Sequence, residues 1–121
     1  MLERVEDAPA HTLALRATGT VVARDVEAAI GAAVGSSSAS TGLVIVIDRD
    51  FDGYFVELAR GLANAALAHK NLVKLALVAG ADRMDEAKIS GFDTSAVPIR
   101  LFTESERNAA LEWAAAARRG E

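Results

Sequence analysis

Cysteine is absent from this sequence of 121 residues. Its absence excludes disulfide bridges, thiolate metal ligands and cysteine nucleophiles, and the composition gives no support for an oxidising compartment. Long apolar runs are also missing, because no stretch reaches the roughly 18 apolar residues that a membrane-spanning helix needs. The first residues are charged and unlike a signal peptide. We therefore expect a cytoplasmic protein whose contact with a membrane is at most peripheral.

The sequence also lacks an excess of positive charge. Lys and Arg number 13 and Asp and Glu number 17, which gives a net charge of −4. A protein that neutralises the phosphates of nucleic acid carries the opposite balance, so no nucleic-acid partner is expected. Hydrophobic residues make up 51% and charged residues 25%, a globular composition. The length predicts one domain spanning residues 1–121.

The sequence motifs that mark common catalytic and cofactor sites are missing as well. There is no G-x-S-x-G elbow, Walker A sequence, G-x-G-x-x-G or H-E-x-x-H pattern. The two histidines, His11 and His69, lie far apart, and the sequence identifies no orienting partner for either. We therefore predict a protein that is not an enzyme and that holds no cofactor and no metal ion.

Hydrophobic patterning predicts alternating strands and helices. The run Leu43–Ile47 is apolar at every position, which is typical of a central strand covered on both faces. The pair Thr103 and Glu106 is a capping box that starts the last helix. The expected strands are 2–6, 12–17, 43–47, 75–79 and 97–102, and the expected helices are 22–34, 54–69, 82–90 and one after Thr103. This order, β-β-α-β-α-β-α-β-α, predicts an α/β fold with a mostly parallel sheet of about five strands flanked by four helices.

The segment Asp48–Gly53 copies the first half of a calcium-binding EF-hand loop. Such a loop takes two oxygens from a Glu at its twelfth position, but Ala59 stands there and Glu57 falls at position ten. The segment also follows a strand rather than a helix. We interpret it as an acidic turn that leads into a helix N-terminus; whether Asp48, Asp50 and Asp52 bind a cation stays open.

The expected helix 54–69 has an unusually wide apolar arc. Its core-facing stripe is Phe55, Leu58, Leu62 and Ala66, and a second stripe beside it comprises Val56, Ala59, Ala63 and Leu67. Packing on one sheet needs a narrower arc. The second stripe is therefore expected to contact another helix, a second subunit or an apolar ligand.

Several segments, in this order, resemble the SpoIIAA-like family, the small bacterial proteins with a STAS or SEC14 domain. They are MLERVED at 1–7, LRATG at 15–19, DFDGY at 50–54, IRLF at 99–102 and ALEW at 110–113. The resemblance implies a SpoIIAA-like (STAS-like) fold over nearly the whole chain. Related anti-sigma-factor antagonists have a phosphorylated Ser in an Asp-Ser-x-Gly turn. Phe51 occupies that position here, so this switch is not carried over.

The resemblance to Sec14-type proteins implies a groove beside a mobile helix. Our first hypothesis is a non-enzymatic module that binds a small apolar or lipid-like ligand, with reversible membrane association. The candidate groove residues are Phe51, Tyr54, Phe55, Leu58 and Leu62. The alternative is a protein-interaction or homodimerisation module with the stripe Val56, Ala59, Ala63 and Leu67 as its interface. An enzyme whose site is assembled only by the fold is the third hypothesis.

Overall fold

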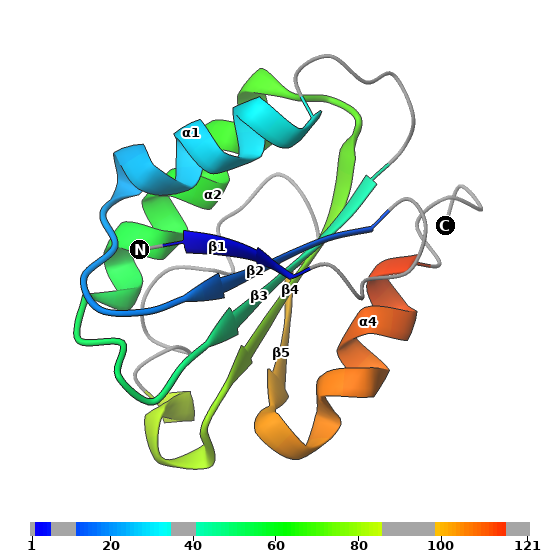
Figure 1. Ribbon diagram of the computed structural model, residues 1–121. Coiled ribbons are helices and arrows are strands. Elements are labelled where there is room, and N and C mark those ends of the chain that lie inside the picture. Colours follow the sequence, from blue (N-terminus) through cyan, green and yellow to red (C-terminus); the bar gives the residue numbers. More distant parts are fainter. Residues whose placement is uncertain (1, 6–11, 35–40, 86–98, 116–121) are drawn as a thin grey trace.

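The computed structural model describes residues 2–5, 12–34, 41–85 and 99–115 (Figure 1). Five strands form one sheet: β1 (Leu2–Val5), β2 (Thr12–Ala17), β3 (Thr41–Ile47), β4 (Leu72–Ala79) and β5 (Ile99–Thr103). The helices are α1 (Ala23–Val34), α2 (Phe55–Ala68) and α4 (Arg107–Ala115), with single 3₁₀ turns η1 (Ala81–Arg83) and η3 (Glu104–Glu106). In these described residues no helix is long and apolar enough to cross a bilayer.

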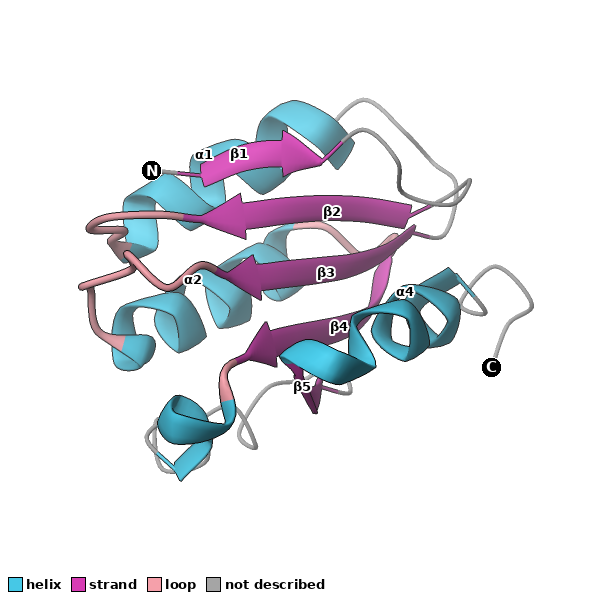
Figure 2. Cartoon of the chain, turned by 60° about the horizontal axis from the view of Figure 1, so that its bottom comes forward, coloured by secondary structure: helices cyan, strands magenta, loops and turns pink. Residues whose placement is uncertain are grey.

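The sheet is mixed, with the strand order β1-β2-β3-β4-β5. Strand β1 runs antiparallel to β2, and the pairs β2–β3, β3–β4 and β4–β5 are parallel. Figure 2 shows the arrowheads of β2, β3 and β4 at one edge of the sheet, with β1 pointing the opposite way. Helices α1 and α2 cover one face and α4 covers the other. The loops that follow the parallel strands therefore gather at one edge.

The observed elements depart from the sequence prediction at three places. The predicted helix 82–90 begins as the 3₁₀ turn η1, residues 84 and 85 continue it in helical conformation, and its residues from 86 onward lie outside the described part, so the fourth helix stays a prediction. Strand β3 begins two residues early, because the Thr41 N–H donates to the Asn71 carbonyl at 2.7 Å and extends the pairing with β4. Strand β4 begins at Leu72 rather than residue 75. Its buried Lys74 interrupts the apolar pattern that a sequence reading follows.

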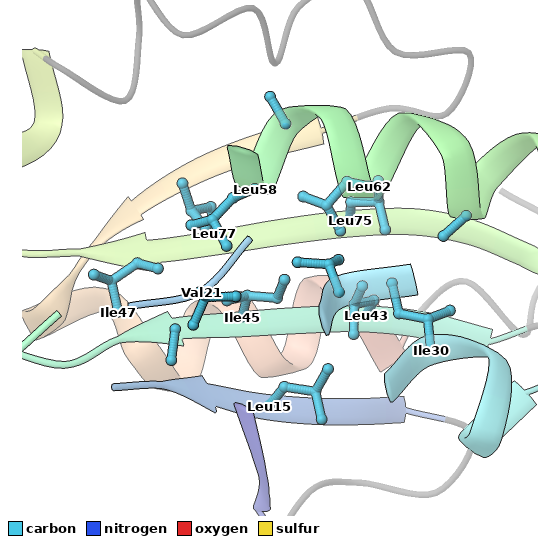
Figure 3. Packing of buried hydrophobic residues seen from close by; sticks show 14 of the residues in the cluster. Leu15, Val21, Ile30, Leu43, Ile45, Ile47, Leu58, Leu62, Leu75 and Leu77 are labelled. Carbon is cyan, nitrogen blue, oxygen red and sulfur yellow. The ribbon is translucent and has the colours of Figure 1, made fainter. Parts of the chain in front are cut away.

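Two clusters of buried side chains lie on the two faces of the sheet. The larger one, between the sheet and helices α1 and α2, contains Leu43 and Ile45 of β3, and Leu75 and Leu77 of β4 (Figure 3). The smaller one contains Val44 and Ala76 of the same strands with Ala110 and Ala114 of α4. Alternate residues of β3 and β4 thus point to opposite clusters, and both strands are buried on both faces.

Backbones approach closely on each face, at points where only a glycine fits. On the α4 face, Gly42 of β3 lies directly under the Ala114 carbonyl of α4. Beside it, the Lys74 ammonium lies 4.9 Å from the Trp113 ring centroid and 3.5 Å from the Trp113 carbonyl oxygen. On the other face, Gly61 of α2 packs against α1, where an added Cβ would lie 2.6 Å from the Cβ of Val26.

Two matched glycine substitutions test this packing. Gly61→Ala should destabilise the fold by about 1–3 kcal/mol through overpacking, more than the helix-propensity gain of up to about 1 kcal/mol. In Gly31→Ala on α1, the nearest atom to the new Cβ is His69 Nε2 at an ordinary 3.6 Å, so this variant should be slightly more stable than wild type. Urea unfolding measures both free energies, and equal stability of the two variants would refute the tight helix contact.

Candidate functional site

The structure brings together four of the five predicted groove residues, but they are part of the hydrophobic core and do not line a groove. Phe51, Phe55, Leu58 and Leu62 are at most 3% exposed and belong to the cluster beneath α2, whereas Tyr54, at the helix start, is 72% exposed. Figure 3 shows Leu58 and Leu62 directed from α2 toward the sheet, over Leu75 and Leu77. The space in which a groove was expected is filled by protein side chains, because α2 packs closely against β3 and β4.

The second stripe of α2 is exposed at only two of its four positions. Ala59 is buried and Ala63 is partly buried, whereas Val56 is 48% and Leu67 is 70% exposed. In the described part of the chain, the large hydrophobic residues that are exposed are Val22, Tyr54, Val56 and Leu67, all on or beside α1 and α2. Of the four predicted interface residues, the exposed ones are therefore Val56 and Leu67, at the two ends of the stripe.

The acidic turn after β3 forms an ion pair with β2 and a hydrogen bond with the segment that follows β2. Asp48 Oδ2 lies 3.3 Å from Arg16 Nε of β2, and Asp48 Oδ1 accepts the Arg49 backbone N–H at 2.6 Å. The Thr20 hydroxyl donates to Asp52 Oδ1 at 2.6 Å. Across the described residues, no three His, Asp or Glu side chains form a group that could hold a metal ion. The carboxylates of Asp48 and Asp52 thus position the turn.

Arg83 covers the aromatic pair at the end of this turn. The rings of Phe51 and Phe55 have centroids 5.6 Å apart, and the Arg83 guanidinium carbon lies 5.2 Å and 4.9 Å from them. One guanidinium nitrogen also donates to the Phe51 carbonyl at 2.6 Å. Sequence analysis did not single out Arg83, because it is far from Phe51 along the chain and no motif marks it. Arg83 lies over the rings because it follows β4, which pairs in parallel with β3, so that the ends of both strands lie at the same edge of the sheet.

Two pockets, of about 300 and 460 Å³, open at the carboxyl ends of the parallel strands. Both are lined by Ile47, Asp48, Arg49 and Glu104. Arg16, Val46, Val78 and Arg107 complete the first pocket, and Gly80, Ala81, Asp82 and Arg83 complete the second. Ligands of open α/β sheets commonly bind at this edge, and both volumes fall in or near the range of small-molecule sites.

The charged groups of the pockets form loose ion pairs. Arg49 NH2 lies 4.0 Å from Glu104 Oε2, with the two side chains 90% and 45% exposed. Arg16 contacts Glu3 at 3.8 Å in addition to Asp48. Exposed pairs of this kind contribute about 0–1 kcal/mol, so a bound ligand can replace them at little cost.

Of the two histidines, His69 belongs to neither pocket lining. His11 lies outside the described residues. His69 ends α2, where its backbone N–H donates to the Ala65 carbonyl at 2.9 Å, and its ring faces Gly31 of α1. The pockets are lined by arginines, carboxylates and small or aliphatic residues.

No protein-family model matches the sequence, and no curated protein is significantly similar to it. Among solved structures, the chain is similar to an uncharacterised protein from Shewanella loihica PV-4, described as a DUF3478-family protein with a SpoIIAA-like fold. The TM-score is 0.57 at 22% sequence identity, over 94% of this chain and 90% of the other. The chain therefore has a SpoIIAA-like fold, as the sequence resemblance predicted.

The capping box predicted at Thr103 and Glu106 is present at the rim of the pockets. The Thr103 backbone N–H donates to Glu106 Oε1 at 3.0 Å, and its hydroxyl lies 3.1 Å from the same oxygen. These two hydrogen bonds, the backbone one first, hold the pKa of the Glu106 carboxyl below its ordinary value, and the charge of Arg100 acts in the same direction. This carboxylate therefore stabilises the fold above the ordinary pKa of a glutamate, and the contribution disappears as the pH falls through the lowered folded-state pKa.

Removing the Thr103 hydroxyl separates the effect of its hydrogen bond on the pKa of Glu106 from the effect of the backbone hydrogen bond. In Thr103→Val the pKa of Glu106 should rise, but should stay below its ordinary value because the backbone N–H still donates. Ser105→Ala, which removes a neighbouring hydroxyl, should leave the pKa of Glu106 unchanged. Carbon-13 NMR titration of the Glu106 carboxyl measures both. A pKa that does not move in Thr103→Val, or that returns to the ordinary value, would contradict this assignment.

Proposed function

We propose that this domain is a non-enzymatic binding module for a small amphiphilic, lipid-like ligand. The charged end of the ligand lies in the pocket at the carboxyl ends of the strands, and its apolar part lies on Phe51 and Phe55 after Arg83 moves aside. One observation carries the proposal: Arg83 both lines the second pocket and covers the two rings. Moving one side chain would therefore join a charged pocket to an apolar surface.

A ligand could reach the rings of Phe51 and Phe55 by lifting α2 or by moving Arg83, and we compare the free-energy costs of the two routes. Lifting α2 would remove Phe55, Leu58 and Leu62 from the core, at about 1.5–3 kcal/mol for each side chain. The total, roughly 5–9 kcal/mol, is comparable with the whole stability of a typical domain. Moving Arg83 breaks, among its contacts, two ring contacts and one charge-assisted hydrogen bond, which contribute roughly 2–5 kcal/mol together. Entry past Arg83 displaces one side chain and leaves Phe55, Leu58 and Leu62 in the core, so we favour it over opening of the groove beneath α2.

The chemistry of the pocket walls supports binding rather than catalysis. Among the described residues, the walls contain no Ser, Lys, Tyr or His, and the carboxylate of Asp48 already accepts hydrogen bonds or ion pairs from Arg16 and Arg49. Nucleophilic catalysis needs a nucleophile within reach of a base. Charged walls of this composition hold and orient a ligand.

Arg83→Ala tests the entry route. Because the cover is removed in advance, we expect the uncharged amphiphile dodecanol to bind at least about tenfold more tightly than to wild type, equivalent to about 1.4 kcal/mol. Isothermal titration calorimetry measures the affinity, and NMR signals of the Phe51 and Phe55 rings report the location.

Arg100→Ala is the matched control, because the Arg100 guanidinium carbon also lies over a ring, 5.1 Å from the centroid of Phe102 on the other face of the sheet. It should leave dodecanol affinity unchanged. Equal affinities for all three proteins, or binding that leaves the signals of Phe51 and Phe55 unmoved, would show that the ligand does not use this route.

A second candidate function, protein interaction through α2, is favoured by the exposed Val56 and Leu67. A 14-residue helix is about 21 Å long and presents a strip about 10 Å wide. The resulting area of about 200 Å² is well below the roughly 800 Å² per partner of a stable complex. Any homodimer through this face is therefore transient.

Sedimentation velocity at tens to hundreds of micromolar tests the second candidate. We expect a weak, concentration-dependent dimer that Leu67→Asp abolishes, because a charge would be buried against the partner. Ala28→Asp, at an exposed position of α1, makes the same charge change elsewhere and should leave the equilibrium intact. A wild-type protein that stays monomeric over this range would rule out the homodimer.

A further inference from the structure

We infer that Glu104 is a built-in competitor for the ligand, and that the charged end of the ligand is a small anion, a carboxylate or a phosphate. The carboxylate of Glu104 now occupies the position beside Arg49 that the anion would take. This inference deepens the proposed function by naming the class of group that the pocket recognises, and it does not depend on the apolar route past Arg83.

The arginines of the first pocket outnumber its carboxylates. Arg16, Arg49 and Arg107 line it together with Asp48 and Glu104, and Arg16 also contacts Glu3, which lies outside the lining, at 3.8 Å. Arg16 and Asp48 are committed to each other at 3.3 Å, and the second Asp48 oxygen accepts the Arg49 backbone N–H. Glu104 is therefore the carboxylate whose position can change without loosening the turn after β3.

The capping box holds the backbone beside Glu104, whereas the Glu104 side chain is partly exposed and forms a long ion pair. Glu104 follows Thr103, which the capping box with Glu106 holds in place. Its carboxylate reaches across Gly80, where an added Cβ would lie 3.4 Å from Glu104 Oε1. From there it contacts Arg49 at 4.0 Å, a distance longer than a good charge-assisted hydrogen bond. Rotation of one side chain would thus exchange the internal carboxylate for an external one.

The geometry favours an anion over a cation. When Glu104 turns away, Arg49 and Arg107, which come from the ends of different elements, remain on the walls of the same pocket. Two guanidinium groups with planar sets of donors match the oxygens of a carboxylate or phosphate. A cation would instead have to compete with Arg16 for Asp48.

Titration with anions that carry no apolar tail tests this inference. Acetate and inorganic phosphate are added separately at constant ionic strength, and arginine Nε–H NMR signals are followed. We expect saturable shifts at Arg49 and Arg107. In Glu104→Gln the dissociation constant should fall about two- to fivefold, because an exposed ion pair no longer competes. In Arg49→Gln it should rise by at least the same factor. Stronger binding of acetate or of phosphate identifies the group as carboxylate or phosphate.

Arg60→Gln is the matched control, because Arg60 is an exposed, ion-paired arginine of α2 that lies outside both pockets. It should bind both anions as wild type does. Unchanged or weaker binding in Glu104→Gln, or an equal loss of binding in Arg60→Gln and Arg49→Gln, would overturn the inference. Anion binding without any dodecanol binding would leave this inference standing and refute the apolar route, so the two proposals fail separately.

Discussion

Burial of β3 and β4 on both faces is the constraint on which the rest of the molecule depends. Leu43, Ile45, Leu75 and Leu77 point toward α1 and α2, while Val44 and Ala76 between them point toward α4. Apart from Thr41 and Lys74 near their amino ends, the described side chains of both strands are apolar. The charged residues that follow these strands, beginning with Asp48 and Arg49, are therefore displaced to the edge where the strands end, and the pockets open there.

The two faces are packed in different ways, and the difference shapes the pockets. The face under α1 and α2 is filled by large aliphatic and aromatic side chains, whereas the buried residues that α4 contributes to the other face are Ala110 and Ala114. These small residues allow α4 to lie directly on Gly42 at its carboxyl end. At its amino end the same helix places Arg107, just after the turn that contains Glu104, at the mouth of the first pocket.

Arg83 and Glu104 have related roles in the proposed function. Each occupies a place that part of a ligand would take: Arg83 lies on the rings of Phe51 and Phe55, and Glu104 lies beside Arg49. Each is a single side chain that, in the proposal, moves while the helices stay packed on the sheet. In the proposal, these two side chains make contacts with the rings and with Arg49 that the apolar part and the anionic end of a ligand would make in their place.

The sequence by itself determined the alternation of strands and helices, the two-faced burial of residues 43–47 and the capping box at Thr103, because each depends on local pattern. The SpoIIAA-like fold was predicted from the resemblance of several segments to that family. The sequence placed Phe51, Phe55, Leu58 and Leu62 in one neighbourhood, but periodicity cannot distinguish a core stripe from the lining of a groove. The tertiary structure alone decided that these side chains are core, that β1 is antiparallel, and that Arg49, Arg83, Glu104 and Arg107 meet at one edge. Arg49, Arg83 and the segment with Glu104 and Arg107 are far apart along the chain, and only the parallel pairing of β3, β4 and β5 brings these strand ends together.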